Sequence, residues 1–351
     1  MEIIKVSATK EYNVHIGSDY LDSIGEKIGE IKRLCRVVLV SDDNVFSFYG
    51  ERVKKSLTDS GYSVFEFVIP NGEESKSVEN FIKIQEFCAE NNITRTDLFV
   101  ALGGGVVGDL TGFVASTYLR GVDFVQIPTT VLAMVDSSVG GKTAINLNAG
   151  KNLCGTFYQP IAVYADCEVL KTLPDESFSD GCAEIIKYGM ILDADFLTFL
   201  KDNDIKENIE YVIKRCVEIK RDIVDRDEFE KGERKLLNFG HTIGHAIEKC
   251  SGYKISHGKA VAIGMVIATK GAFELGLSYD DYSDTLLPIL EKNKLPTICE
   301  FSADDLYKVS MTDKKRSRDV ISLIVPEEYG LCKIHKISVD QLKDFIELGL
   351  K

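Results

Sequence analysis

The chain carries, at residues 97–109, the stretch DLFVALGGGVVGD, which decides the fold of its first half. Asp97–Leu102 has the composition of a buried strand, and the helix-compatible run Leu110–Ser116 follows the glycines. Between strand and helix the glycines satisfy the pattern G-x-G-x-x-G, which lets backbone N–H groups approach a pyrophosphate at the positive end of a helix. The stretch favours a dinucleotide site, with a tight structural turn as the alternative.

Further strands and helices alternate around this unit. Runs rich in β-branched residues predict four more strands, at Arg36–Ser41, Ser63–Val68, Asp123–Pro128 and Ala162–Ala165, with helical patterns at Asn44–Ser60 and Ser77–Asn91. Strands separated by helices require crossover connections, so we expect a Rossmann-like α/β domain with a mostly parallel sheet. In an ordinary dehydrogenase an acidic residue for the ribose ends the next strand, but here Asp123 begins it. Asp42 and Asp43 end an earlier strand, and we expect the ribose contact there.

From about Pro174 the pattern changes to long amphipathic helices. They are predicted at Glu176–Lys201, Ile205–Asp227, Lys235–Cys250 and Gly258–Glu274, with a single strand at Asp319–Pro326. The length of 351 residues suits two domains, which we place at residues 1–173 and 174–351. With no flexible linker between them, the interdomain cleft is the expected active site.

Charge and cysteine usage narrow the class of protein. A formal net charge of −13 argues against nucleic-acid or membrane partners, which require a positive face. An anionic substrate must then be bound by a local cluster of lysines and arginines. The nine cysteines are scattered and odd in number, and no run of 18 apolar residues or signal-peptide pattern is present. These features predict a soluble cytoplasmic protein with reduced thiols.

Three of the five histidines lie within seventeen residues, namely His241, His245 and His257. His241 and His245 are four residues apart, so a helix would place both imidazoles on one face, where they could hold a metal. Thr242 follows the first histidine where a zinc protease has glutamate, which argues against that class. A catalytic site would add a carboxylate, for which helix context offers Glu184 or Glu248. The alternative is a set of core or capping histidines, the role we expect for His15 and His335.

A second cluster carries positive charge. Residues 136–143 read DSSVGGKT, Gly150-Lys151-Asn152 follows, and Arg120 precedes them. The frame G-x-x-x-x-G-K-[ST] is missing, because Asp136 stands five residues before Gly141, which argues against a P-loop NTPase. Glycine beside each lysine favours loops that approach an anionic ligand closely, with a solvated charged surface as the alternative.

Together these motifs resemble the 3-dehydroquinate synthase family, part of the sugar phosphate cyclases. The match runs in order over nearly the whole chain. It is carried by Gly103–Asp109, Leu119–Gly121, Pro128–Thr130, Val135–Lys142, Gly150–Asn152, Ala183–Lys187, Leu237–Glu248 and His257–Gly258.

The resemblance implies a fold and an activity. It suggests an N-terminal NAD-binding α/β domain, a mainly helical C-terminal domain and a homodimer. The expected substrate is an anionic sugar phosphate, 3-deoxy-D-arabino-heptulosonate 7-phosphate. It would be oxidised by NAD, lose phosphate, be reduced, and close to a carbocycle after ring opening. Zn²⁺ or Co²⁺ would act as a Lewis acid.

The resemblance also assigns residues. The metal ligands would be Glu184, His241 and His257, with His245 and Glu230 in proton transfer. Substrate contacts would be Arg120, Asp136, Lys142, Asn152, Lys187, Lys220, Arg234, Asn238 and either Lys314 or Lys315. NAD contacts would be Asp42, Asn44, Glu73, Glu74, Ser75, Lys76, Gly104, Gly105, Val106, Asp109, Thr129, Thr130, Lys151, Val169, Leu170, Lys171 and Thr172. Asp180 receives no role.

Two related families are the alternatives. In 2-deoxy-scyllo-inosose synthases the Gly-Gly-Lys stretch is altered and an acid stands at the position of Asn238. Glycerol dehydrogenases lack the apparatus of Asp136–Lys142 and Lys151-Asn152. On both counts the present chain is more similar to the 3-dehydroquinate synthases.

Overall fold

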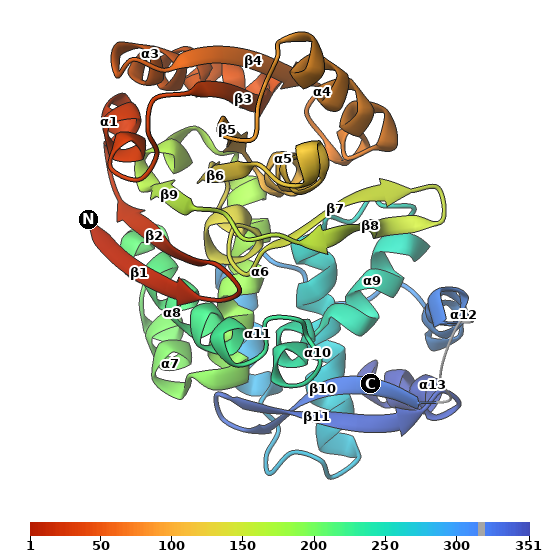
Figure 1. Cartoon of the computed structure of the whole chain (residues 1–351). Helices are drawn as coiled ribbons and strands as arrows, with labels where there is room; N and C mark the ends of the chain where they lie inside the picture. Colours follow the sequence, from red (N-terminus) through yellow and green to blue (C-terminus); the bar gives the residue numbers. More distant parts are fainter. Residues whose placement is uncertain (315–319) are drawn as a thin grey trace. The chain divides into compact units, whose positions relative to one another are not determined.

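A computed structural model of the chain describes residues 1–314 and 320–351 (Figure 1). It divides into two compact units, unit 1 with Met1–Pro174 and Cys216–Phe229, and unit 2 with Asp175–Arg215 and Glu230–Lys351. The predicted division into residues 1–173 and 174–351 differs at one place. Helix α8 (Ile209–Arg226) begins in unit 2 and ends in unit 1. Amphipathic periodicity shows that a helix has an apolar face but not which core that face joins.

Unit 1 is built on a seven-stranded sheet with the order β1-β2-β9-β6-β5-β3-β4. Only β1 and β2 pair antiparallel, and the other neighbours are parallel. The prediction of a mostly parallel sheet is therefore confirmed. The strands are β1 (Glu2–Ser7), β2 (Glu11–Gly17), β3 (Arg36–Asp42), β4 (Ser63–Ile69), β5 (Leu98–Gly103), β6 (Asp123–Pro128) and β9 (Ala162–Asp166).

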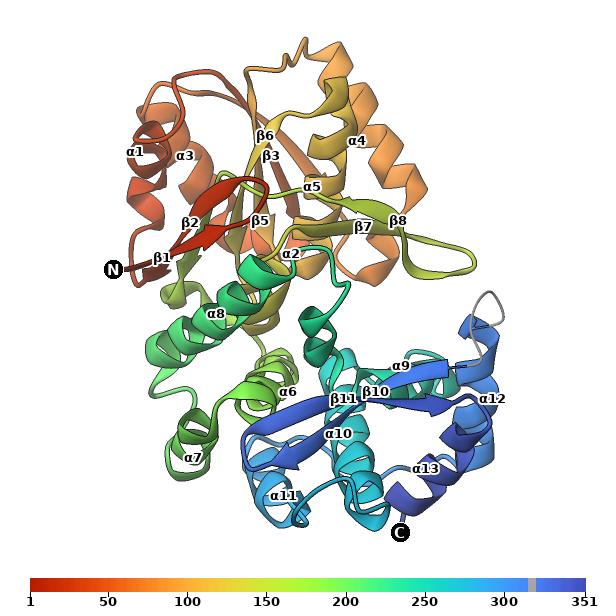
Figure 2. The same ribbon diagram turned by 60° about the horizontal axis from the view of Figure 1, so that its bottom comes forward.

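Helices cover both faces of this sheet. Figure 2 shows α4 (Val78–Glu90) and α5 (Gly105–Thr117) on one face, and α1 (Ile24–Gly29) and α3 (Glu51–Asp59) on the other. Val38 and Val40 of β3 belong to the core cluster that also holds residues of α4 and α5. Val37 and Leu39 are also fully buried and, by strand alternation, face the opposite layer. This two-sided burial explains the nearly continuous apolar sequence of the central strands.

A hairpin of β7 (Lys142–Leu147) and β8 (Gly150–Phe157) packs against α5. Lys142, Lys151 and Asn152 were predicted in loops, and this prediction is wrong because all three lie on these strands. Ile145 enters the core cluster, and the Thr143 hydroxyl donates to the Thr156 carbonyl at 2.9 Å. Glycines and lysines interrupt the short apolar alternation of these strands, so the sequence pattern does not predict them. The hairpin is stabilised by packing against α5.

Unit 2 is mainly helical, as predicted. Its helical elements are α6 (Asp175–Leu192), α7 (Ala194–Asp202), the start of α8, η7 (Glu233–Asn238), α9 (His241–Cys250), α10 (His257–Glu274), α11 (Ser283–Lys292), α12 (Ala303–Lys314) and α13 (Gln341–Gly349). Two of the predicted helices are each broken. Asp193 ends α6 and caps α7, accepting from the Phe196 amide at 2.8 Å, and Gly240 with φ of 78° separates η7 from α9.

The single predicted strand is half of an antiparallel hairpin of β10 (Val320–Glu328) and β11 (Leu331–Ser338). The prediction of one strand is wrong because the lysines and histidine of LCKIHKIS obscure its alternation. Among the helices that the structure describes, none combines the length and apolarity that a membrane crossing requires.

Helix α10 is the centre of unit 2 and packs against α6, α9, α11, α13 and β10. Its crossing with α9 is close because Gly264 has no side chain. A Cβ at Gly264 would lie 2.1 Å from the Gly240 carbonyl oxygen, which belongs to the backbone and cannot move away on its own. The distance between α9 and α10, which carry the clustered histidines, is thus set by glycine.

We predict that Gly264→Ala lowers the free energy of unfolding by at least about 1–3 kcal/mol, the usual cost of overpacking. Gly29→Ala is the matched control, since a Cβ there meets nothing nearer than 3.9 Å. It should be neutral or stabilising, because alanine reduces the entropy of the unfolded chain. Urea unfolding measures both variants, and equal stabilities would contradict the crossing argument.

Candidate active site

The carboxyl ends of β3 and β5 form a topological switch point in unit 1. From β3 the chain moves outward to β4 and then returns to β5 on the other side of β3. Ligands of open α/β sheets bind outside the strand ends at such a point. Asp42 ends β3 and Gly103 ends the neighbouring β5, with Ser41 opposite Leu102 in the ladder. The structure thus brings the acidic end of an earlier strand beside the glycine stretch, as the sequence predicted.

The glycine stretch packs closely against its neighbours at the start of α5. Gly104 is the N-cap of α5, and a Cβ there would meet Thr130 Cγ2 at 3.1 Å. A Cβ on Gly105 would meet Ser137 Oγ at the same distance of 3.1 Å. The Thr129 and Ser137 hydroxyls are buried without a hydrogen-bond partner in the described structure. Orphan hydroxyls beside a helix N-terminus fit the pyrophosphate of a dinucleotide.

Other predicted NAD contacts are tied to this edge by hydrogen bonds. The Tyr49 hydroxyl contacts the Val169 carbonyl at 3.0 Å and Thr172 Oγ1 at 2.7 Å. It thereby joins η2 (Phe46–Gly50) to η6 (Cys167–Thr172), which follows β9. Asp42 caps the short helix α2 (Asp43–Val45), accepting from the Val45 amide at 2.9 Å. Burial raises the pKa of Asp42.

The buried Lys76 forms an ion pair with Asp109, a partly buried residue of α5. Lys76 follows η3 (Glu73–Ser75), and Asp109 lies in the first turns of α5. Burial raises the pKa of the Asp109 carboxyl, while its pairing with Lys76 opposes that rise. The pair holds the Glu73–Lys76 segment against the glycine helix. The structure therefore brings together two predicted NAD-binding segments, in which Lys76 and Asp109 are 33 residues apart in the sequence.

The predicted substrate residues of unit 1 lie on several elements. Asp136 in η5 (Ala133–Ser137) pairs with Lys220 of α8 at 2.7 Å, so the chain's return to unit 1 brings a lysine to this carboxylate. Lys142 is exposed at the start of β7. Arg120 ends η4 (Tyr118–Arg120) with a left-handed φ of 68°. Asn152 in β8 has a left-handed φ of 58°.

In unit 2, Glu184, His241 and His257 converge. Glu184 on α6 is fully buried, and its Oε1 accepts no hydrogen bond in the described structure. His241 Nε2 lies 3.3 Å and His257 Nε2 3.6 Å from this oxygen. A tetrahedral zinc with ligand bonds of about 2.0–2.2 Å places its ligands roughly 3.4 Å apart. The three side chains therefore fit a divalent metal ion.

The other ring nitrogens determine which atoms face Glu184. His241 Nδ1 lies 3.0 Å from the Phe239 carbonyl oxygen, and His257 Nδ1 lies 3.4 Å from a Glu248 carboxylate oxygen. Each acceptor favours a proton on Nδ1 and leaves the lone pair on Nε2, the pattern of metal-ligating histidines. Each histidine is the first residue of its helix, α9 or α10, so helix starts rather than one helical face bring the imidazoles together.

Lys187, a predicted substrate contact, pairs with Oε2 of Glu184 one turn earlier on α6. Burial alone would raise the pKa of Glu184, but Lys187 and, when they are protonated, the imidazoles hold that pKa well below its usual range. The carboxylate is therefore charged and able to bind a cation. A buried carboxylate with compensating charge on one oxygen and an open second oxygen is the main electrostatic feature of unit 2.

His245 belongs to a different group. It lies one turn after His241 with 5.5 Å between ring centroids, and its ring is exposed. With Glu248 and His257 it forms a second possible metal-binding group. The i, i+4 spacing alone allowed His241 and His245 to bind one metal ion together. Of the two possible metal-binding groups in the described residues, neither contains both histidines.

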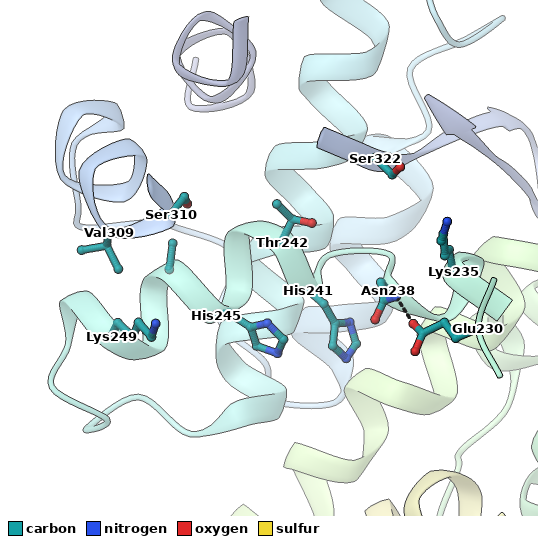
Figure 3. Close-up of a pocket in the computed structure, with 11 residues that line it drawn as sticks. Glu230, Lys235, Asn238, His241, Thr242, His245, Lys249, Val309, Ser310 and Ser322 are labelled. Atoms are coloured by element: carbon teal, nitrogen blue, oxygen red, sulfur yellow. Dashed lines mark hydrogen bonds between the residues drawn. The ribbon is translucent and has the colours of Figure 1, made fainter. Parts of the chain in front are cut away.

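A pocket of about 360 Å³ lies along α9 (Figure 3). Figure 3 shows His245, His241, Asn238 and Glu230 projecting one after another on one side. The Asn238 side-chain amide donates to Glu230 at 2.6 Å. The lining residues are Glu230, Lys235, Asn238, His241, Thr242, His245, Ala246, Lys249, Val309, Ser310 and Ser322.

The remaining predicted substrate contacts are Arg234 and one of Lys314 and Lys315. Arg234 is almost fully buried in η7. Lys314 is the last residue of α12, and Lys315 lies outside the described residues. The choice between these two lysines thus stays a prediction.

Sequence reasoning missed the role of Asp180. Its carboxylate accepts from the Ser256 hydroxyl at 2.5 Å and from the Lys259 amide at 3.1 Å, at the first turn of α10. A Cβ on Gly258 would lie 2.0 Å from the Asp180 carbonyl oxygen, so α6 touches α10 beside His257. Asp180 lies one turn before Glu184, and this i, i+4 spacing on α6 was the available signal.

Solved structures with the same architecture define the class. A 2-deoxy-scyllo-inosose synthase, solved with carbaglucose-6-phosphate, NAD⁺ and Co²⁺, has a TM-score of 0.87 at 27% identity, covering 99% of each chain. The 2-epi-5-epi-valiolone synthase of Streptomyces hygroscopicus subsp. jinggangensis 5008, solved with NAD⁺ and Zn²⁺, shares the fold with a TM-score of 0.86 at 24% identity, covering 98% of each chain. Fold and site together define a sugar phosphate cyclase.

Sequence comparison narrows this class. The model of the 3-dehydroquinate synthase N-terminal part matches residues 66–180, and that of the C-terminal part matches residues 181–316. The 3-dehydroquinate synthase of Clostridium acetobutylicum is 43% identical over 343 residues, covering 96% of each chain. The chain belongs to the 3-dehydroquinate synthase family. Its activity is that of an NAD- and metal-dependent lyase of the shikimate pathway.

We predict that His241→Ala strips or greatly weakens metal binding, because it removes one of the three atoms that surround the metal position. His245→Ala is the matched control from the same helix and should keep near-stoichiometric metal. Elemental analysis after dialysis measures both. Retention in the His241 variant with loss in the His245 variant would move the ion to the group of His245, Glu248 and His257.

Proposed function

We propose that the chain converts 3-deoxy-D-arabino-heptulosonate 7-phosphate to 3-dehydroquinate and phosphate, with Glu184, His241 and His257 as the metal ligands. One observation carries the assignment of the ligands. The buried Oε1 of Glu184 has no hydrogen-bond donor, and two Nε2 atoms face it at tetrahedral ligand spacing. A His₂-carboxylate set accepts Zn²⁺ or Co²⁺, and we propose either ion for this site.

The cofactor is assigned to the switch point of unit 1. We propose that the start of α5 binds the pyrophosphate of NAD and that Asp42 accepts from a ribose hydroxyl. The free Thr129 hydroxyl and the close approach at Gly104 support this. When bound, the metal polarises a substrate oxygen and NAD accepts and later returns a hydride.

Proton transfer is assigned to the pocket of unit 2. His245 has an exposed ring there, and an imidazole exchanges protons near neutral pH. Glu230 accepts a hydrogen bond from Asn238 in the same pocket, which orients its carboxylate. We propose that His245 and Glu230 move protons while Asn238 binds a substrate hydroxyl.

The substrate carries a carboxylate and a phosphate, so an acidic chain must supply local positive charge. We propose that Arg120, Lys142 and Lys220 in unit 1, and Lys187 and Arg234 in unit 2, provide it. Lys187 and Lys220 are held in ion pairs with Glu184 and Asp136, and Arg234 is almost fully buried, so these three cations have defined positions, which supports a role in binding. Asp136 is proposed to orient Lys220 through their ion pair.

The setting of the enzyme follows from composition and family. All nine cysteines are free in the structure, which suits a reducing cytoplasm. The charge of −13 supports a small-molecule substrate without nucleic-acid or membrane partners. The family resemblance supports a homodimer.

Turnover tests the proposed reaction. Purified protein with the sugar-acid phosphate, NAD⁺ and Zn²⁺ should release phosphate without accumulating NADH, because the hydride is returned within each cycle. A colorimetric phosphate assay and absorbance at the NADH band measure the two products. Steady NADH formation from a simple polyol, without phosphate release, would instead support a polyol dehydrogenase.

Lys142→Ala should lower kcat/KM for the sugar phosphate at least about tenfold, because a charge-assisted hydrogen bond contributes roughly 1.5–3 kcal/mol. Lys83→Ala is the control, since Lys83 lies exposed on α4 in an i, i+4 pair with Glu79. Steady-state kinetics of both variants decide the question. Unchanged kinetics in the Lys142 variant would place the anionic site elsewhere.

A further inference from the structure

The β7–β8 ladder is irregular where two predicted ligand-binding residues lie. Ile145 pairs with Cys154 and Leu147 with Gly150, so Asn146 alone faces Lys151, Asn152 and Leu153. A bulge of this kind leaves amides without ladder partners and redirects side chains, and bulges are common beside active sites. Lys151 and Asn152, proposed to contact NAD and substrate, are both on the bulge.

Asn146 makes three hydrogen bonds around this bulge. Its Oδ1 accepts from the Asn152 amide at 2.8 Å, which satisfies a donor that the ladder leaves unpaired and holds Asn152 at its left-handed φ of 58°. Its Nδ2 donates to Glu73 Oε1 at 2.6 Å. Its backbone amide donates to the Lys76 carbonyl at 2.8 Å.

These bonds connect the two ligand-binding parts of unit 1. Glu73 and Lys76 lie in the segment proposed to contact NAD, and Lys76 is paired with Asp109 at the start of the glycine helix. Asn152 lies in the part proposed to contact the substrate. Asn146 is the link, because its side chain bonds to both parts at once. Leu147, the next residue, is two-fifths exposed, so hydrophobic burial does not explain the geometry of this position.

We infer that Asn146 is a positioning residue, which holds the β8 bulge and couples the orientation of Asn152 to the Glu73–Lys76 segment. The inference rests on the proposed NAD and substrate contacts. It requires an amide at this position, because one side chain must donate to a carboxylate and accept from a backbone N–H at the same time. Neither aspartate nor alanine can do both.

The first test separates the two bonds. Asn146→Ala should lower kcat/KM for the sugar phosphate about tenfold and weaken NAD⁺ binding several-fold, since each lost hydrogen bond changes an equilibrium by a factor of roughly 2 to 10. Asn146→Asp keeps the acceptor for Asn152 but places a second carboxylate against Glu73. It should weaken NAD⁺ binding while retaining more of the substrate handling than the alanine variant.

A rescue variant distinguishes positioning from general damage. In Asn146→Asp combined with Glu73→Gln, the glutamine amide can donate to the aspartate, so the hydrogen bond is restored in the reverse direction. NAD⁺ affinity, measured by isothermal titration calorimetry, should be higher in the double variant than in Asn146→Asp alone. Glu73→Gln alone is the reference for the effect of the second substitution. A purely structural loss would not be restored by reversing donor and acceptor.

Controls keep the outcomes separate. Asn148→Ala in the exposed turn between β7 and β8 should behave as wild type. Metal content should be wild type in every variant, since the proposed ligands lie in unit 2. The inference is overturned if Asn146→Ala matches wild type in NAD⁺ affinity and kcat/KM, or if the double variant fails to recover. Wild-type protein that binds NAD⁺ but releases no phosphate would instead contradict the proposed reaction.

Discussion

The buried carboxylate of Glu184 is the constraint on which unit 2 depends. A charged group without water costs several kcal/mol unless opposite charge or hydrogen bonds compensate it. Lys187 compensates one oxygen, and the two imidazoles face the other. Three helices must therefore meet at fixed distances, and glycines at the α9–α10 and α6–α10 contacts permit this.

In unit 1 the order of the parallel strands brings the predicted ligand-binding residues together. Parallel strands end at one edge of the sheet, so the acid after β3 and the glycines after β5 become neighbours without any long-range specificity in their own sequences. Pairing of Lys76 with Asp109, and the bonds of Asn146, then attach the outer segments to that edge. The proposed dinucleotide and substrate contacts of unit 1 thus depend on one sheet edge and one hairpin.

Much of this was predictable because it is local. Strand periodicity located β3, β4, β5, β6 and β9, although not β2, which pairs parallel with β9, and the glycine stretch located the switch-point helix. The β7–β8 hairpin was predicted as loops, and only one strand of the β10–β11 hairpin was predicted. Lysine and glycine interrupt the pattern of these strands, whose stability comes from packing on other elements. Asp180 was likewise missed, since its partners Ser256 and Lys259 are more than 70 residues away.

The sequence by itself determined the α/β-then-helical organisation, the clustering of histidines and the family, because each depends on residue types at short spacing or in fixed order. Residue spacing alone left both His245 and His257 open as partners of His241, and only the family resemblance named His257; in the structure the Nε2 atoms of His241 and His257 face Glu184. The i, i+4 pair lies on one helical face, but the first turns of two separate helices point their Nε2 atoms at one carboxylate. Only the tertiary structure decided that the end of α8 joins unit 1 and brings Lys220 to Asp136. Such placements depend on which apolar surfaces pack together, and no short stretch of sequence encodes that choice.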